Sequence, residues 1–483
     1  MIGTRAFRLS PEELRPRAEA LRAAGGRLQF AYTWFPAREA PEVRYLSSIP
    51  GRHDFDMWVV TGQRELPSLT GVFPLIGWYE REMTDLQGLT FAGHPEPHPL
   101  VLRDGGTRIN GNGFANGRAH LPHLDAADVQ QLPFGPIRAD VVESAEFTFL
   151  YVGEHIIHYQ PRLFFKHRGM ESCFEGAGPE CAVVIAERVS GVGSVAHALG
   201  YCEAIERAAG CEAPKRAKAL RVLIAELERL YNHLHYLGHL CHTTTLKVGE
   251  AQGKLLEETA KQLNARLTGS RFLRGVLAPG GLRRDLDPGK WLGDALESLR
   301  EEFVAYVDRL ETSESHLDRL ITTGLLPEKV AFDQGASGPV ERASGLNRDL
   351  RRDHPYAHYA ELPLTVPTLN EADAYARERV RIAEVEASFV LCQRVLLLLE
   401  PGPIRSACEP RPLSEGLGWT EGPRGSLFYA VHIGADGRLA RVKIKSPSFS
   451  NWRAFPFTVH DTNMMDYAIN EASFGLTVAG CDR

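Results

Sequence analysis

The sequence predicts an α+β protein, in which a small N-terminal unit of helices and strands precedes a larger, mainly helical unit with small sheets at its margins. Aromatic and β-branched runs separated by turn residues predominate in residues 1–100, a pattern typical of strands. Apolar residues at helical spacing predominate in residues 172–322 and 371–400. With 43% hydrophobic and 24% charged residues, the composition is that of a globular protein and excludes global disorder.

The N-terminal unit is expected to span residues 1–100 and to begin with a helix. Ser10 and Pro11 are a capped helix start, and Gly25 and Gly26 end the helix. The other elements expected in this unit are strands at 28–35, 43–49 and 55–62 and a helix at 78–86.

Residues 101–133 are expected to be a linker, because Gly, Asn, His and Asp are concentrated there. The second unit, residues 134–483, begins with two short strand-like runs around Gly153 and Glu154, which indicate a hairpin. Its core is predicted to be a helical bundle. The elements expected in it are helices at 216–240, 249–267, 289–317 and 371–400 and strands at 147–152, 155–159, 426–434 and 439–445.

Charge and hydropathy exclude several classes of function. The chain has 55 Lys and Arg against 61 Asp and Glu, a net charge of −6, so it lacks the basic character of a nucleic-acid binder. No uncharged apolar stretch approaches the ~20 residues that cross a bilayer. The first residues lack the apolar core of a secretory signal. We therefore expect a soluble, cytoplasmic protein with no nucleic-acid partner.

The cysteine spacing argues against a sequence-local metal or redox motif. No two of the eight cysteines are closer than eight positions, so there is no C-x-x-C for zinc, an iron–sulfur cluster or thiol exchange. They are expected to be mostly buried and reduced. They are Cys173, Cys181, Cys202, Cys211, Cys241, Cys392, Cys408 and Cys481.

Two charged clusters have both a functional and a structural interpretation. Glu80, Arg81 and Asp85 share a helix before a Gly-His-Pro turn; they form an interface or proton-handling surface, or simply pair along the helix, which these residues alone favour. In the segment 166–171, Arg168 and Glu171 either pair and anchor a loop, which is again favoured, or line an inner polar cavity.

Two further clusters are rich in small residues. Residues 187–197 place two glycines and two serines between Arg188 and His197, but neither phosphate-binding glycine pattern is present, so no nucleotide site is expected. Near the C-terminus, small residues around Gly475 and Gly480 predict a close approach of the backbone to another element. A row of histidines is expected to line a surface or pocket rather than hold a metal; it comprises His233, His235, His239 and His242.

In this order, the clusters resemble the large subunit of membrane-bound group 4 nickel–iron hydrogenases and the 49-kDa subunit of respiratory complex I. The N-terminal unit resembles the 30-kDa subunit of complex I through E-R-E-x-x-D-x-x-G-x-x-F-x-G-H-P at residues 80–95. The resemblance covers nearly the whole chain and implies a fused 30-kDa/49-kDa-type subunit. Its other motifs are KHRGMES (166–172), residues 213–234, 269–281 and 338–356, EGPRGSLFY (421–429) and SPSFSN (446–451).

The chain departs from the hydrogenases at all four thiolate positions of their nickel–iron site. Where the family has R-x-C-G-x-C-x-x-x-H, this chain has residues 188–197, with Ser190 and Gly193 at the ligand positions. Where it has D-P-C-x-x-C-x-D-R, this chain has Thr477 and Gly480, and Cys481 falls one position late. Hydroxyls are poor ligands for a site built from soft thiolates, and glycine offers none. The resemblance therefore implies no metal in this chain and no hydrogenase activity.

The quinone-binding pair of complex I is also missing. Its histidine falls on Val142 and its tyrosine on Gly191. The family's arginine near the terminal iron–sulfur cluster of the partner does match, at Arg188. The sequence is thus similar to hydrogenase-related complexes that have lost the metal site, and a quinone stays a candidate acceptor only in a remodelled cavity.

The resemblance implies a non-autonomous subunit of an ion-translocating respiratory oxidoreductase, peripheral on the cytoplasmic face of the inner membrane. Its implied partners are an iron–sulfur small subunit and antiporter-like and quinone-channel-like membrane subunits, and this chain itself binds no cofactor. It would form the acceptor cavity, with a positive bias; the alternative is a redox-silent scaffold whose charges pair into a closed polar plug. No catalytic residue is assigned, and the cavity candidates are Arg168, Glu171, Arg188, His197, Asp482 and Arg483.

Overall fold

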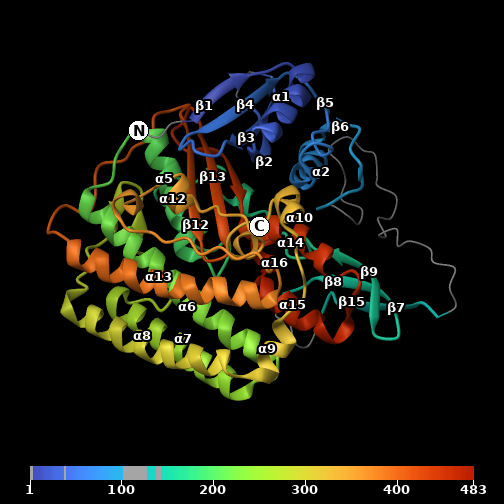
Figure 1. Cartoon of the computed structure of the whole chain (residues 1–483). Coiled ribbons are helices and arrows are strands. Elements are labelled where there is room, and N and C mark those ends of the chain that lie inside the picture. Colours follow the sequence, from blue (N-terminus) through green and yellow to red (C-terminus); the bar gives the residue numbers. More distant parts are fainter. Residues whose placement is uncertain (1–3, 37–39, 102–127, 138–142) are drawn as a thin grey trace.

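A computed structural model describes residues 4–36, 40–101, 128–137 and 143–483, and it confirms the predicted fold class. The N-terminal unit is a four-stranded sheet in the order β1-β4-β3-β2, with β1 parallel to β4 and the other pairs antiparallel (Figure 1). Ser10 and Glu13 form a capping box at the start of its first helix, as the sequence predicts. The elements are β1 (Thr4–Arg8), α1 (Pro11–Ala23), β2 (Arg27–Trp34), β3 (Glu42–Ser48), β4 (Phe55–Thr61), β5 (Glu65–Pro67), α2 (Gly77–Gln87) and β6 (Thr90–Ala92).

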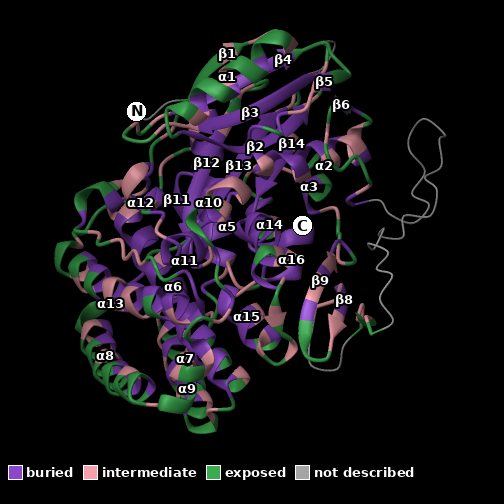
Figure 2. Cartoon of the chain, turned by 45° about the vertical axis from the view of Figure 1, so that its right-hand side comes forward, coloured by how far each residue is buried: buried purple, intermediate pink, exposed green. Residues whose placement is uncertain are grey.

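A three-stranded sheet lies between the N-terminal sheet and α5 (Ser194–Ala209). It consists of β12 (Glu415–Gly422), β13 (Gly425–Ile433) and β14 (Leu439–Lys445). On one face, the ring of Trp419 lies 4.9 Å from that of Phe55 in β4. On the other face, the ring of Tyr429 lies 5.9 Å from that of His197 in α5. The buried residues around this sheet form the centre of the molecule (Figure 2).

Strand β12 is absent from the sequence prediction because its glycines interrupt the strand pattern. A Cβ at Gly416 would lie 2.0 Å from the carbonyl oxygen of Ala204, and one at Gly418 would lie 2.0 Å from that of Gly200. The strand therefore needs glycine to let the backbone of α5 approach closely. The same two glycines therefore obscure the strand in the sequence and allow it to pack against α5.

Four long helices form the lower layer of Figure 1: α6 (Lys215–Thr243), α7 (Lys247–Thr268), α8 (Gly289–Glu311) and α13 (Ala374–Leu398). The helices α6 and α7 meet at Gly238 and Gly253, where a Cβ on Gly253 would lie 2.6 Å from the Cα of Gly238. The helix predicted at 289–317 is two helices, because Ser313 is the N-cap residue of a new one, α9 (Glu314–Leu320).

A second small sheet has the order β15-β9-β8-β7 and contains the predicted hairpin. Its strands are β7 (Gln130–Phe134), β8 (Glu146–Val152), β9 (His155–Arg162) and β15 (Thr462–Asn463). Strand β7 begins inside the range predicted as a linker; as an edge strand that contains Pro133, it has little apolar patterning. Residues 102–127 of that range lie outside the described residues.

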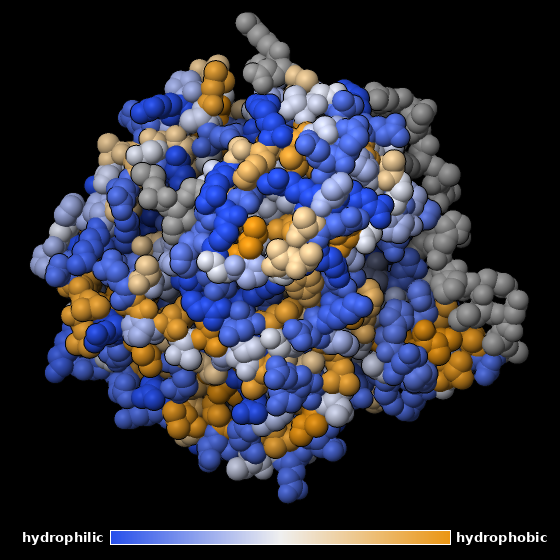
Figure 3. Space-filling view, turned by 45° about the horizontal axis from the view of Figure 1, so that its top comes forward, coloured by the Kyte–Doolittle hydropathy of each residue, from blue (hydrophilic) through white to orange (hydrophobic). Residues whose placement is uncertain are grey.

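The remaining elements are short and connect these layers. None of the helices in the described ranges combines the length and apolar composition needed to span a bilayer. The face in Figure 3 is mostly hydrophilic, with hydrophobic residues scattered over it. The short elements are α3 (Met170–Cys173), α4 (Val183–Ala186), β10 (Leu277–Ala278), β11 (Gly281–Leu282), α10 (Glu328–Gln334), α11 (Pro339–Ala343), α12 (Leu350–Asp353), α14 (Pro447–Ala454), α15 (Tyr467–Phe474) and α16 (Val478–Asp482).

Candidate functional site

A small cavity, cavity A, lies where three distant segments meet: the turn into α5, the β12–β13 turn, and the C-terminal residues with the start of α14. It has room for about 20 Å³, which is the space of about one water molecule. It is lined by Ser190, Val192, Gly193, Ala196, His197, Gly422, Pro423, Arg424, Gly425, Leu427, Ser446, Pro447, Ser448 and Gly480.

The four residues that the resemblance places at the metal-ligand positions of the hydrogenases lie together at this cavity. Ser190, Gly193 and Gly480 line it, and the Thr477 hydroxyl accepts a hydrogen bond from the Gly480 amide at 3.2 Å. A Cβ at Gly480 would lie 3.4 Å from the hydroxyl oxygens of both Ser190 and Ser448. Hydroxyls and glycines offer no soft thiolate ligand, so these residues do not fit a nickel–iron centre.

Two related observations concern metal binding nearby. Cys481 does not line cavity A; it is fully buried, and burial keeps the pKa of its thiol well above the usual value. Within the ranges that the structure describes, no group of three or more His, Cys, Asp or Glu side chains is arranged to hold a metal.

His197 forms one wall of cavity A and is held in its neutral form. Its ring is 2% exposed, and Nδ1 lies 2.8 Å from the hydroxyl of Tyr429. Burial, together with the charge of Arg168, lowers its pKa to about 3. The imidazole therefore offers the cavity a neutral polar group rather than a cation.

We expect His197→Gln to reduce the acid sensitivity of the chain. Because the pKa of His197 is lower in the folded than in the unfolded state, its stabilising contribution is complete above pH ~6.5 and is lost as the pH falls towards 3. Between pH 7 and pH 5 this loss amounts to about 2 kcal/mol in the free energy of unfolding. Urea unfolding at both pH values should show that much less decline in the variant than in the parent chain.

Arg424 supplies the positive charge of cavity A. It lies at the β12–β13 turn and is half-buried; it donates to the carbonyl oxygen of Gly475 at 2.7 Å and to Oδ1 of Asn232 at 2.8 Å. No carboxylate of the described residues lies within ion-pair distance of it. Burial lowers its pKa to about 10, so it remains a cation at neutral pH.

Glu228 of α6 lies behind the cavity and caps α5. Its two carboxylate oxygens accept hydrogen bonds from the amides of Val195 and Ala196 at 2.7 and 2.8 Å. Burial raises its pKa to about 7, although these bonds lower it. Neither Arg424 nor Glu228 is among the residues predicted from the sequence. The motif EGPRGSLFY contains a signal for Arg424, whereas Glu228 resembles an ordinary charge on an amphipathic helix.

Two of the predicted cavity residues point elsewhere. Arg188 does not line cavity A: its side chain is 54% exposed and donates to the carbonyl oxygen of Val184 at 2.8 Å. Arg168 is also exposed, and it donates to the carbonyl oxygens of Arg188, Val189 and Ala479 at 3.1, 2.6 and 3.3 Å. It therefore ties the turn before α5 to the C-terminal segment.

Glu171 and Arg483 lie together in an ion-pair cluster between the two units. Arg483 contacts Glu171 at 3.3 Å and Glu82 of α2 at 2.7 Å, and Lys443 contacts Glu82 at 2.7 Å and Glu171 at 3.1 Å. Burial would raise the pKa of Glu171, but Lys443, Arg483 and Arg441 hold it at about 2. Together these five side chains, with Arg441 at 3.2 Å from Glu171, are called the interdomain cluster below.

Asp482 is the last of the predicted cavity residues, and it binds backbone rather than an arginine. One carboxylate oxygen accepts a hydrogen bond from the amide of Lys166 at 2.9 Å. The side chain is buried, and burial raises its pKa to about 6. Of the six predicted residues, only His197 lines cavity A.

The charged helix of the N-terminal unit and the histidine row have structural partners. The carboxylate of Glu80 accepts from the Leu69 amide at 2.7 Å, and that of Asp85 accepts from the Leu100 amide at 2.7 Å, so these residues hold loops rather than pair along α2. His235 lies 3.0 Å from Glu257, and His242 lies 3.0 Å from Glu250, both in α7.

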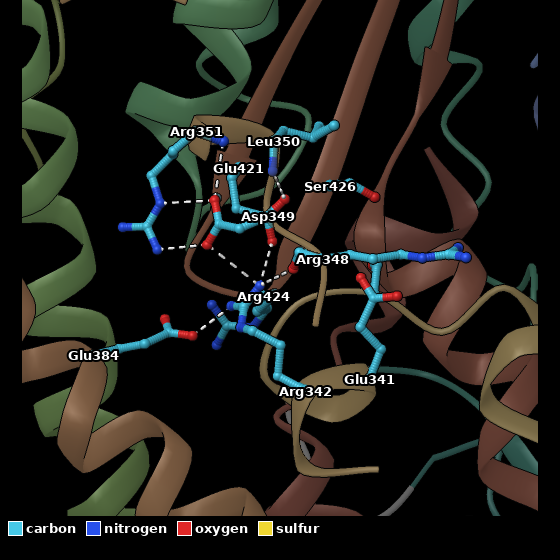
Figure 4. A network of polar contacts seen from close by, with 12 residues as sticks. Glu341, Arg342, Arg348, Asp349, Leu350, Arg351, Glu384, Glu421, Arg424 and Ser426 are labelled. Atoms are coloured by element: carbon cyan, nitrogen blue, oxygen red, sulfur yellow. Dashed lines mark hydrogen bonds and ion pairs between the residues drawn. The ribbon is translucent and has the colours of Figure 1, made fainter. Parts of the chain in front are cut away.

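A buried ion-pair network, shown in Figure 4, joins the helical layer to the β12–β13 turn. Arg342 binds Glu384 of α13, Glu421 at 3.2 Å and Asp349 at 3.4 Å. Glu384 also accepts from Arg229 at 3.2 Å and lies 2.9 Å from Nε2 of His233. All these side chains are at most 5% exposed. The network fixes the hairpin that carries Arg424.

Three family models match different parts of the chain. The model of the 30-kDa subunit of respiratory-chain NADH dehydrogenase matches residues 7–110. The model of nickel-dependent hydrogenases matches residues 168–269. The model of the 49-kDa subunit of respiratory-chain NADH dehydrogenase matches residues 256–413 and 408–483.

Individual proteins of these families are also similar to the chain. Formate hydrogenlyase subunit 5 of Escherichia coli (strain K12) is 31% identical over 421 residues, 83% of this chain and 74% of that protein. The C/D subunit of NADH-quinone oxidoreductase from Cereibacter sphaeroides (strain ATCC 17025 / ATH 2.4.3) is 27% identical over 516 residues, 93% of this chain and 87% of that protein. Among solved structures, a chain of the membrane-bound sulfane sulfur reductase, an archaeal respiratory membrane complex, superposes with a TM-score of 0.69 at 26% identity, over 75% of this chain and 100% of that one.

Proposed function

The chain belongs to the family of fused 30-kDa/49-kDa-type subunits that complex I shares with the group 4 hydrogenases, and on this premise we propose that it forms the electron-accepting cavity of a membrane-bound respiratory oxidoreductase without a nickel–iron site. In this proposal an iron–sulfur partner subunit delivers electrons towards cavity A. Antiporter-like and quinone-channel-like membrane subunits then couple electron transfer to ion movement. The chain acts only within the complex and has no hydrogenase activity.

The observation that carries this proposal is the cationic side chain of Arg424 in a cavity otherwise lined by apolar side chains, glycines, serine hydroxyls and a neutral imidazole. A fixed positive charge in a low-dielectric site stabilises negative charge that develops there. Arg424 therefore takes the role that the sequence assigned to Arg188 and its neighbours. A site of this kind suits an acceptor that becomes more negative when it is reduced.

We expect Arg424→Met to lower acceptor-linked electron transfer by the whole complex at least tenfold, because it keeps the volume of the side chain and removes its charge. A tenfold fall corresponds to about 1.4 kcal/mol of lost charge stabilisation. The measurement is steady-state turnover with a water-soluble quinone, alongside gel filtration to establish that the complex is assembled. Arg300→Met is the matched control, since Arg300 lies on the surface of α8 and pairs there with Glu386 of α13. Turnover of the Arg424→Met complex at the parental rate would exclude cavity A as the working site.

One observation favours a second function, that of a redox-silent scaffold. Cavity A has about 20 Å³ of free space, whereas ligand pockets have ~300–1,000 Å³, so a quinone ring would need the β12–β13 turn to move. Glu171 and Arg483 are also fully paired in the interdomain cluster. Under this second function the Arg424→Met complex assembles and turns over like the parent.

A further inference from the structure

A larger cavity, cavity B, lies on the other side of the β12–β13 turn. It has a volume of about 260 Å³ and separates the loops of the N-terminal sheet at residues 25–29 and 48–52 from residues 347–354. Gly51 and Asn347 at its edge are exposed, whereas Glu341, Glu421 and Ser426 at its floor are at most 4% exposed. Figure 4 shows these three floor residues around the ion-pair network. Water thus has a polar route from the surface to the hairpin.

Cavities A and B lie on opposite faces of one hairpin end. Glu421 pairs with Ser426 across the strands, and Gly422 pairs with Gly425 one step nearer the turn. Side chains alternate between the faces of a strand. Glu421 and Ser426 therefore face cavity B, while Gly422 and Gly425 line cavity A. Because both paired residues nearest the turn are glycines, little more than one layer of backbone separates the two cavities.

Lys445, the last residue of β14, is a buried amine beside the floor of cavity B. It is 1% exposed, and its Nζ donates to the carbonyl oxygen of Ser426 at 3.0 Å and to the Ser426 hydroxyl at 2.5 Å. No carboxylate of the described residues lies within 4 Å of it. Burial and the charge of Arg27 lower its pKa to about 7, although Glu341 and Glu421 raise it.

Glu421 faces the same space from β12. Its carboxylate accepts from Arg342 at 3.2 Å and from the amide of Leu350 at 3.4 Å. Burial and the charge of Asp349 raise its pKa to about 7, with a further contribution from Glu341 and opposing ones from Arg342 and Arg351. The charged groups that face the pair from the packed elements are Arg27, Glu341, Arg342, Asp349 and Arg351.

We propose that Lys445, with Glu421, is a proton-uptake site supplied with water through cavity B, which gains a proton when an electron reaches cavity A on the opposite face of the hairpin. This inference rests on the proposed function. A hydronium ion in cavity B transfers its proton to the lone pair of the neutral amine, which becomes an ammonium ion, and a water molecule remains. The electron comes from the iron–sulfur partner and stays on an acceptor of the quinone class, whose one-electron reduction adds an electron and breaks no bond.

The expected coupling is electrostatic and requires no contact between the two sites. A unit charge placed ~10 Å away in the protein interior changes a protonation equilibrium by on the order of tenfold. A lysine that is already near half-protonation responds to such a change by taking up a substantial part of one proton. An exposed lysine, fully protonated at neutral pH, takes up none.

The test is the number of protons taken up when the purified complex is reduced in the presence of a water-soluble quinone, at the same concentration for the parent and the variants. Reduced methyl viologen is a suitable donor because it delivers electrons without protons, and a pH-indicator dye in weak buffer reports the uptake. We expect Lys445→Arg and Lys445→Met to take up fewer protons than the parent, by at most one per complex. The difference should be greatest near pH 7 and smaller at pH 5 and pH 9. Lys329→Arg, on the exposed face of α10, is the matched control.

The two lysine variants distinguish the loss of a titrating amine from a disturbance of the fold. Lys445→Arg keeps a positive charge and the donors to Ser426 but does not titrate near neutrality, whereas Lys445→Met keeps the volume without the charge. Parental uptake in both variants would overturn the proposal. The proposed function fails by a different result, a parental turnover of the Arg424→Met complex, so the two failures are distinguishable.

Discussion

Glu384→Gln is expected to lower the free energy of unfolding by about 3–5 kcal/mol, because it removes the one charge that Arg342, Arg229 and His233 share. Arg342 and Arg229 hold the pKa of Glu384 well below its usual value despite burial, so the carboxylate is fully charged at neutral pH. The variant keeps the shape of the side chain but leaves two buried guanidinium groups with less compensating charge. Urea unfolding followed by circular dichroism measures the loss.

The matched control for this prediction is Glu386→Gln, two residues further along α13. Glu386 pairs with Arg300 at 2.9 Å, but its side chain is 33% exposed, so its loss should cost at most about 1 kcal/mol. If both variants lost the same small amount of stability, the buried network would not be what holds the β12–β13 turn in place.

Glu82→Gln is expected to loosen the N-terminal unit from the rest of the chain and to cost about 3–5 kcal/mol. Glu82 is the only member of the interdomain cluster that comes from the N-terminal unit, and it pairs with both Lys443 and Arg483. Without its charge, both cations depend on Glu171. Hydrogen exchange of β14 and α2 should rise together in the variant.

Glu96→Gln provides the comparison for Glu82. Glu96 pairs with Arg81 in the same unit, but its side chain is 71% exposed, so hydrogen exchange should stay at the parental level. An equal rise in both variants would mean that the N-terminal unit responds to any lost charge rather than to the interdomain cluster.

Local patterns predicted most of the elements. The apolar spacing of 216–240 and 249–267 is sufficient for α6 and α7, since each helix buries one stripe whatever its partner is. Strand β12 required knowledge of its neighbour, because the glycines at 416 and 418 have a purpose only when α5 is in place. The periodicity of a helix is visible within its own segment, whereas the need for glycine at a close backbone contact depends on the neighbouring element.

The site was less predictable than the fold, for a related reason. The order of motifs along the chain brings the turn at 188–197 and the C-terminus together, but it does not say which way Arg188 points or that Arg483 pairs with Glu82, 401 positions away. Choice of ion-pair partner depends on burial and on long-range packing. The sequence therefore located the cavity through Ser190, Gly193 and Gly480 better than it identified the charges around it.

The glycine pair at the end of the β12–β13 hairpin has a consequence for kinetics. A Cβ at Gly425 would lie 2.4 Å from the hydroxyl of Ser337, and one at Gly422 would lie 3.1 Å from the Cβ of Ala196, so the hairpin end is closely packed against Ser337 and against α5. The electric field of an electron in cavity A therefore reaches cavity B without a movement of the backbone between them. The rate of proton uptake at Lys445 after reduction should be independent of solvent viscosity, whereas the closure of a hinged lid slows down in glycerol.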